Sequence, residues 1–232
     1  MEKVILLVHG YKRHEQHDFD DFFLYAKDKL NCPIEKVYWF DNYDKKTLTT
    51  ESFLTQIDQV MEKYQDKEII IISYSMGACL FLTEGYKWKN ITDIFAIYPT
   101  YYISHFGWLG KIFKTIKLRR KLRKKLSKER YKRLLQNKEK APVEKYPIRL
   151  TLEMNNFRMY LLKNLGKVTD KNLYIFLNHK DEANKTKKTY KVLKKRIDTD
   201  NRVTYYWINE SHYTILIHNP DLYDQLIDLL NL

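Results

Sequence analysis

The stretch Ile69-Ile70-Ile71-Ile72-Ser73-Tyr74-Ser75-Met76-Gly77-Ala78 decides the fold. Four consecutive isoleucines are typical of a buried strand, and small residues then lead into a helical segment. A nucleophile elbow has this order of strand, tight turn and helix, and needs small residues two positions before and after the nucleophile. Ser73 and Gly77 meet that need around Ser75, although Gly is more usual at the first position. The alternative is an ordinary buried turn, because Ser and Gly are common at such junctions.

Outward from this stretch, short apolar runs alternate with helical segments, a pattern typical of a parallel sheet built from βαβ units. The predicted strands span residues 4–8, 36–40, 68–73, 93–98, 173–177 and 203–207. The predicted helices span residues 19–30, 50–64, 76–88, 184–197 and 221–230. The sequence therefore predicts an α/β protein, with a mostly parallel sheet of about six strands and helices on both faces.

The alternation stops after Tyr98-Pro99 and resumes near Asn172. We therefore predict one domain whose core is formed by residues 1–99 and 172–232, with an inserted basic helical cap at residues 100–171. Within the insert, leucines recur every four residues among Lys and Arg, at Leu118, Leu122 and Leu126. This spacing indicates a basic amphipathic helix, and a second helical stretch is expected around residues 150–165.

The net charge of +13 is concentrated in this insert. Between Lys111 and Lys140 there are 15 Lys or Arg against only Glu129 and Glu139, so the rest of the chain is neutral. Three interpretations stay open for the basic segment. The three are a solvated helix face, a helix that lies on an anionic membrane surface, and a binding surface for an acidic partner. Nucleic acid ranks last as a partner, because the sequence holds no recognition motif for it.

The first apolar run is too short for a signal peptide or a membrane span. Cys32 and Cys79 are the only cysteines, so we expect two buried thiols and no disulfide framework. The sequence thus favours a cytoplasmic protein, with a peripheral position at the membrane surface as an alternative. The oligomeric state stays open.

Two further residues give the serine a chemical role. A serine hydroxyl needs a base within hydrogen-bond reach and a third group that orients the base. Asp181 and His212 each follow the carboxyl end of a predicted strand, as Ser75 does, and sites in open α/β sheets gather at that edge. Taken singly, His212 could be a surface loop histidine, and Asp181 a loop carboxylate or a helix cap. The order Ser, Asp, His on three separate strand ends favours a catalytic triad.

The first predicted strand ends in Val8-His9-Gly10-Tyr11, where Gly10 lets the backbone turn toward the serine. The backbone amides of Tyr11 and Met76 are therefore candidates for an oxyanion hole, with a plain strand-to-loop turn as the alternative. His9 is expected to support the site or the core. The other histidines have no metal-ligand spacing, and we expect neither a metal nor a cofactor.

These motifs resemble the α/β-hydrolase superfamily, and within it the small capped carboxylesterases and monoacylglycerol-lipase-like serine hydrolases. The resemblance covers essentially the whole chain and rests on His9-Gly10-Tyr11, the Ser75 motif, the Asp181 turn and Ser211-His212. It implies an α/β-hydrolase fold in which Ser75, Asp181 and His212 perform acyl transfer. Two departures stand out: the chain starts at the family's third strand, and a strongly basic insert is not general among the family's caps.

The predicted function is that of a serine hydrolase that cleaves a small-molecule carboxylic ester, as a carboxylesterase or lipase-like enzyme does. Trp108, Phe113 and Phe157 are candidates for the acyl-binding site, together with Phe106, Ile112 and Met159, and simple packing of the cap on the core is the alternative for each. The rival functions are a thioesterase and a non-catalytic protein of the same fold that binds an acidic partner or an anionic membrane.

Overall fold

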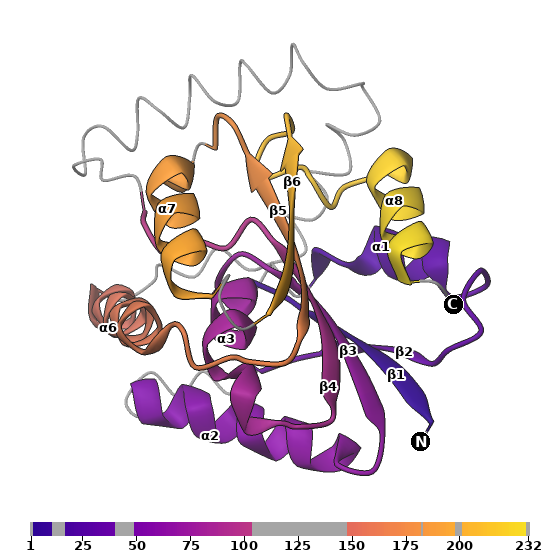
Figure 1. Ribbon diagram of the computed structural model, residues 1–232, viewed down its shortest axis with the longest axis horizontal. Coiled ribbons are helices and arrows are strands. Elements are labelled where there is room, and N and C mark those ends of the chain that lie inside the picture. Colours follow the sequence, from indigo (N-terminus) through magenta and orange to yellow (C-terminus); the bar gives the residue numbers. More distant parts are fainter. Residues whose placement is uncertain are drawn as a thin grey trace.

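A six-stranded parallel sheet forms the centre of the protein (Figure 1). The computed structural model describes residues 2–10, 17–39, 49–103, 148–181, 183–197 and 201–230. The strands are β1 (Lys3–Val8), β2 (Ile34–Val37), β3 (Glu68–Tyr74), β4 (Ile91–Ile97), β5 (Asn172–Asn178) and β6 (Arg202–Ile208). They lie in the order β2-β1-β3-β4-β5-β6, and every neighbouring pair is parallel. The predicted α/β architecture is confirmed.

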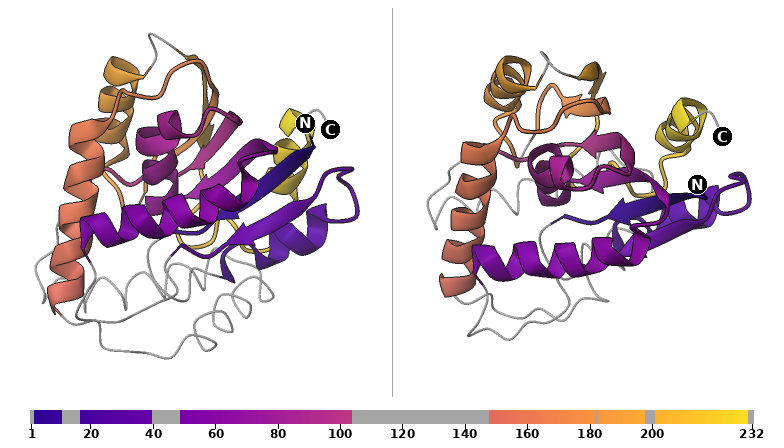
Figure 2. Two further views of the ribbon diagram at one scale, coloured as in Figure 1. Left: turned by 90° about the horizontal axis from the view of Figure 1, so that it is seen from below. Right: turned by 60° about the horizontal axis from the view of Figure 1, so that its bottom comes forward.

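Helices cover both faces of the sheet (Figure 2). They are α1 (Asp20–Ala26), α2 (Thr50–Met61), α3 (Met76–Glu84), α6 (Ile148–Asn164), α7 (Thr186–Arg196) and α8 (Pro220–Leu230), with short 3-10 turns η2 (Glu62–Tyr64) and η3 (Gly85–Lys87). The apolar side chains of α2, α3, α6 and α7 pack on one face, and those of α1 and α8 on the other.

Burial on both faces explains the uninterrupted apolar strands. In β1, Val4 and Leu6 point to the cluster under α2 and α3, whereas Ile5 and Leu7 point to the cluster under α1 and α8. Successive side chains of a strand alternate between faces, so a strand covered on both sides needs an apolar residue at every position. The same alternation runs through the isoleucines of β3.

One strand has different bounds from those predicted. We predicted a strand at residues 36–40, but β2 spans Ile34–Val37 and pairs with β1 from Ile34. The aromatic residues after Val37 suggested a longer strand, yet Trp39 lies past its end and buries its ring in the core. Only Val37 of this edge strand is buried, so no apolar pattern marks its ends.

Helix α6 confirms the helical stretch expected around residues 150–165, and it packs on the core. Its side chains Met154, Phe157 and Leu161 lie in the same cluster as those of α2 and α3, and Figure 2 shows α6 standing against one end of α2. The basic segment between Lys111 and Lys140 lies outside the described residues, so the inserted cap stays a prediction. Among the described helices, none is both long and apolar enough to cross a membrane.

Candidate active site

Ser75 stands at a strained turn between β3 and α3. Its backbone has φ 55° and ψ −111°, a conformation that costs a residue with a side chain on the order of 1–3 kcal/mol. The turn is held from both sides, because the Ser75 amide donates to Ile97 O at 2.8 Å and the Cys79 amide donates to Ser75 O at 3.2 Å. The strand, turn and helix predicted from the sequence are therefore present, with the serine at the carboxyl end of β3.

The small residues around Ser75 have separate structural reasons. A Cβ on Gly77 would lie 2.5 Å from His9 O and 3.0 Å from Val8 O, so only glycine lets the first turn of α3 approach the end of β1. Ser73 is fully buried, and its hydroxyl donates to Phe95 O at 3.1 Å. A serine at the position where glycine is more usual thus has a partner on the neighbouring strand.

A chain of hydrogen bonds joins the three candidate residues. His212 Nε2 lies 3.3 Å from Ser75 Oγ, and His212 Nδ1 lies 2.9 Å from Asp181 Oδ2. A histidine that carries its proton on Nδ1 satisfies both contacts, because it donates to the carboxylate and accepts the serine proton on Nε2. The side chains of His212 and Asp181 are 5% and 1% exposed, so the contact between them is shielded from water.

The Asp181 carboxylate is held by three donors. Its Oδ1 accepts from the amides of Ala183 at 2.7 Å and Asn184 at 2.9 Å, while Oδ2 faces His212. Asp181 is thus both a loop carboxylate bound to local amides and the partner of the histidine, and it does not cap α7, whose N-cap is Lys185. Because the backbone amides fix Oδ1, the carboxylate cannot rotate without losing two hydrogen bonds.

The loop that carries His212 is anchored by residues that sequence reasoning missed. The Tyr98 hydroxyl donates to Glu210 O at 3.1 Å, the Asn178 amide donates to the same oxygen, and the Tyr74 hydroxyl donates to His212 O. All three residues lie at the carboxyl ends of β3, β4 and β5. Their position at the edge that holds the serine was the available signal.

Thr100 is a further neighbour of the serine that the sequence did not single out. Its Oγ1 lies 3.3 Å from Ser75 Oγ and donates to Tyr98 O at 3.0 Å. Since the one hydroxyl proton of Thr100 is used on Tyr98 O, its oxygen is an acceptor toward Ser75. Thr100 and His212 are therefore alternative acceptors for the Ser75 proton at the same distance.

Of the two predicted oxyanion donors, one lies within the described residues. Met76 is the first residue of α3, where backbone amides have no partner within the helix. Tyr11 lies outside the described residues. His9 is buried and stacks on Trp39 at 6.0 Å between ring centroids, and Trp39 Nε1 donates to His9 O at 3.1 Å. This packing fits the supporting role expected for His9.

The three candidates for acyl binding differ in where they lie. Trp108 and Phe113 are outside the described residues. Phe157 is fully buried on α6, and its ring centroid lies 5.8 Å from that of Trp39 and 5.1 Å from that of Phe53. These contacts make Phe157 part of the core under the sheet, and its contact with an acyl chain stays a prediction.

The two cysteines contribute no nucleophile to this site. Cys79 is fully buried one helical turn after Ser75, and burial raises the pKa of its thiol well above the usual range. Cys32 is only partly buried, so the expectation of two buried thiols was wrong for this residue. In the described part of the chain, His, Cys, Asp and Glu side chains form no group suited to a metal ion.

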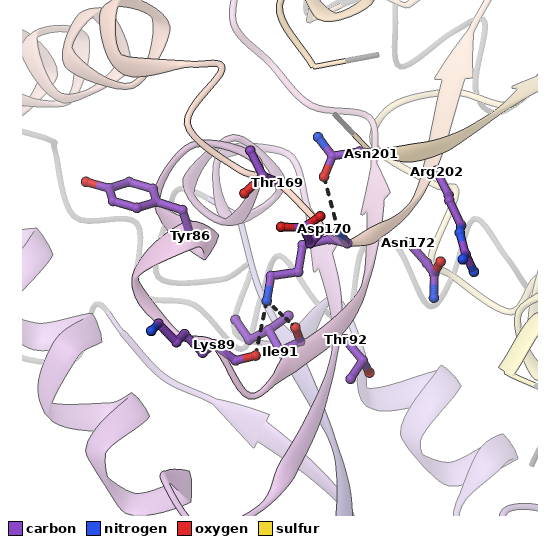
Figure 3. A pocket seen from close by; sticks show the side chains of 10 residues that line it. Tyr86, Lys89, Ile91, Thr92, Thr169, Asp170, Asn172, Asn201 and Arg202 are labelled. Carbon is purple, nitrogen blue, oxygen red and sulfur yellow. Dashed lines mark hydrogen bonds between the residues drawn. The ribbon is translucent and has the colours of Figure 1, made fainter. Parts of the chain in front are cut away.

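A polar cavity of about 930 Å³ lies at the opposite edge of the sheet (Figure 3). It is lined at the amino ends of β4, β5 and β6, among others by Lys171, Asn172 and Arg202. The ammonium group of Lys171 donates to Ile91 O at 2.5 Å and Lys89 O at 3.2 Å, and burial lowers its pKa. This cation links backbone segments, and the cavity is remote from Ser75.

Comparison of the sequence with known proteins gives no match. No family model matches the chain, and no curated protein matches it.

Solved structures match the fold over the whole chain. A peroxisomal α/β-hydrolase of Saccharomyces cerevisiae superposes with a TM-score of 0.68 and 13% identity, over 100% of this chain and 77% of that one. A structure from a study of the metagenome-derived lipolytic enzymes LipS and LipT gives 0.67 and 10%, over 99% and 94%. The thioesterase domain from the curacin biosynthetic pathway gives 0.66 and 14%, over 100% and 92%. The chain has the α/β-hydrolase fold.

Proposed function

We propose that the protein is a serine hydrolase that transfers the acyl group of a carboxylic ester to water. The hydrogen-bonded chain from Asp181 through His212 to Ser75, at a strained turn of an α/β-hydrolase fold, carries this proposal. Esterases, lipolytic enzymes and a thioesterase among the similar structures support hydrolysis as the reaction class.

The mechanism follows from the orientation of the imidazole. Ser75 Oγ attacks the ester carbonyl carbon as His212 Nε2 takes its proton, and the protonated histidine then gives that proton to the departing alkoxide. Water attacks the acyl-enzyme by the same route, releases the acid and restores the serine. Asp181 accepts the Nδ1 proton and stabilises the imidazolium.

The oxyanion that forms in each step needs donors near Ser75. The Met76 amide, at the start of α3, is one proposed donor, and the Tyr11 amide is the other. Each preorganised donor is worth roughly 3 kcal/mol of transition-state stabilisation.

The test is labelling of the purified protein with a fluorophosphonate probe, which modifies activated serines. We expect labelling on the peptide that contains Ser75, with none in Ser75→Ala. Ser73→Ala is the matched control, because it removes a buried hydroxyl from the same turn. Absence of labelling in the wild type would argue for the non-catalytic rival, a protein of this fold that binds an acidic partner.

A thioesterase is the second candidate, and the similarity to a thioesterase domain favours keeping it. Both reactions pass through the same acyl-enzyme and differ in the leaving group. Hydrolysis of an oxygen ester and of a thioester with the same acyl group separates the two functions. Deacylation is the same for both substrates, so a higher kcat/KM for the thioester assigns the second function.

Trp108, Phe113 and Phe157 are proposed to contact the acyl chain, and an acyl-length series on their alanine variants tests this.

We further propose that the basic segment between Lys111 and Lys140 contacts an anionic membrane surface and that the protein is cytoplasmic. Two cysteines without a disulfide support a reducing compartment. Replacing Arg119, Arg120, Arg123, Lys124 and Lys125 with Gln is expected to weaken binding to anionic vesicles and to leave hydrolysis of a small ester unchanged. Unchanged vesicle binding would contradict the membrane proposal.

A further inference from the structure

Helix α7 carries many positive charges, although the chain outside the insert has no net charge. Seven basic residues and no acidic one lie between Ala183 and Ile197. Lysines four positions apart, such as Lys187, Lys191 and Lys195, repel each other and oppose helix formation. The helix therefore forms because its other face is packed, and its charged face does not contribute to that packing.

The lysines of α7 share one exposed face. At 100° per residue, Lys187, Lys188, Lys191, Lys194 and Lys195 fall within an arc of about 120°. The buried residues Thr189 and Leu193 lie on the opposite side of the helix. None of these five lysines pairs with a carboxylate in the part of the chain that the structure describes.

Exposed apolar side chains border this charged face. Trp207 on the edge strand β6 is 39% exposed, and its ring stacks on His179 at 4.7 Å and meets Tyr190 of α7 at 5.3 Å. Ile103 is 41% exposed and forms a β-bridge with Asn184, just before α7. Tryptophan, tyrosine and lysine together are typical of surfaces at the headgroup region of a bilayer.

The helices on the other face of the sheet are acidic, although Asp20 and Asp224 are paired with Lys36 and Lys29. Helices α1 and α8 contain five aspartates and no Lys or Arg, and they pack on the other face of the sheet. Figure 1 shows α7 and the pair of α1 and α8 on opposite sides of the fold. The side of α7 is therefore the more positive of the two, and such an asymmetry favours its approach to an anionic surface.

We propose that the exposed face of α7, with Trp207 and Ile103 at its border, docks the protein on an anionic lipid bilayer. The lysines meet the headgroups, and the Trp207 ring enters the interface beside them. A nucleic acid or an acidic protein would satisfy the same charges, but the exposed apolar border favours lipid. The proposal does not depend on the serine chemistry.

Co-sedimentation with vesicles tests the charged face. Each lysine near an anionic surface is worth about fivefold in partitioning, so the triple variant Lys187→Gln, Lys191→Gln and Lys195→Gln should bind phosphatidylserine-containing vesicles on the order of 100-fold more weakly. The matched control is Lys27→Gln, Lys63→Gln and Lys89→Gln, which removes the same charge from exposed lysines outside α7. We expect a much smaller loss in the control, and neither protein should bind pure phosphatidylcholine. An equal loss in both triple variants would overturn the proposal.

Tryptophan quenching tests the orientation. Brominated anionic lipids should quench the wild-type protein, and the Trp207→Phe variant should lose much of that quenching although its thermal midpoint is unchanged. Undiminished quenching in Trp207→Phe would overturn the proposed docking face. Tight binding to a DNA duplex that depends on the α7 lysines, without lipid quenching of Trp207, would instead assign the face to nucleic acid.

Discussion

Replacement of Asp181 by asparagine separates two roles of this residue, which are the orientation of His212 and the hydrogen bonding of the loop that follows. In the native protein, Oδ1 accepts from the amides of Ala183 and Asn184, and Oδ2 faces His212 Nδ1. An asparagine keeps both backbone hydrogen bonds only if its oxygen takes the place of Oδ1. Its NH₂ group then points at His212 Nδ1 and requires that nitrogen to be an acceptor. The imidazole proton moves to Nε2, where it blocks acceptance of the Ser75 proton.

The expected loss is large because the wrong tautomer disables the base. The same substitution in a serine protease triad lowers kcat roughly 10⁴-fold without a change of geometry. At about 1.36 kcal/mol for each tenfold change in rate, this equals about 5.4 kcal/mol of transition-state stabilisation. The assay is hydrolysis of an activated soluble ester, with kcat and KM measured separately. We expect the loss in kcat, since substrate binding does not use the imidazole proton.

A matched control and a spectroscopic readout make this reasoning refutable. Asp170→Asn makes the same atomic change at an exposed aspartate beside the cavity at the other edge of the sheet, and it should leave kcat unchanged. Nitrogen-15 NMR of labelled histidine should show the His212 proton on Nδ1 in the wild type and on Nε2 in the variant. Activity above one tenth of the wild-type value, or an unchanged tautomer together with lost activity, would refute the proposed role.

Three other substitutions test the site and its surroundings. Gly77→Ala should lower the free energy of unfolding by about 1–3 kcal/mol in urea titration, because the added Cβ would lie 2.5 Å from His9 O. Thr100→Val should raise kcat/KM by at most about fivefold, the equivalent of one neutral hydrogen bond, because His212 then has no competitor for the Ser75 proton. A tenfold fall would assign Thr100 a direct role. Lys171→Met should cost about 1–3 kcal/mol in unfolding through unpaired carbonyl groups and leave kcat unchanged.

The strand ends were the most predictable part of the site. Ser75, Asp181 and His212 each follow an apolar run, and parallel strands bring their carboxyl ends to one edge whatever the details of packing. Tyr74, Tyr98 and Asn178 were not predicted, because their hydrogen bonds reach loop carbonyls whose position depends on the tertiary fold. Their position at the strand ends was a signal, but it does not tell which loop carbonyl each side chain reaches.

The less predictable features have separate physical causes. Only Val37 of strand β2 is buried, so its apolar residues did not mark its ends. The helix around residues 150–165 was predicted, but the packing of Met154 and Leu161 under the sheet was not, because such contacts depend on the tertiary fold. Net charge was equally uninformative for α7, since the aspartates of α1 and α8 offset its lysines in the total.

Asp181 connects the two surfaces for which we propose functions. Its Oδ2 faces His212, and its Oδ1 holds the amides of Ala183 and Asn184, the residues that lead into α7. Because α7 starts at the carboxyl edge of the sheet, its lysines begin within two turns of the carboxylate that orients the base. A bilayer that binds α7 would therefore lie beside the edge that holds Ser75. Under this arrangement, anionic vesicles should raise the rate for an ester dissolved in the bilayer, and the triple α7 lysine variant should lose that gain but keep its rate on a soluble ester.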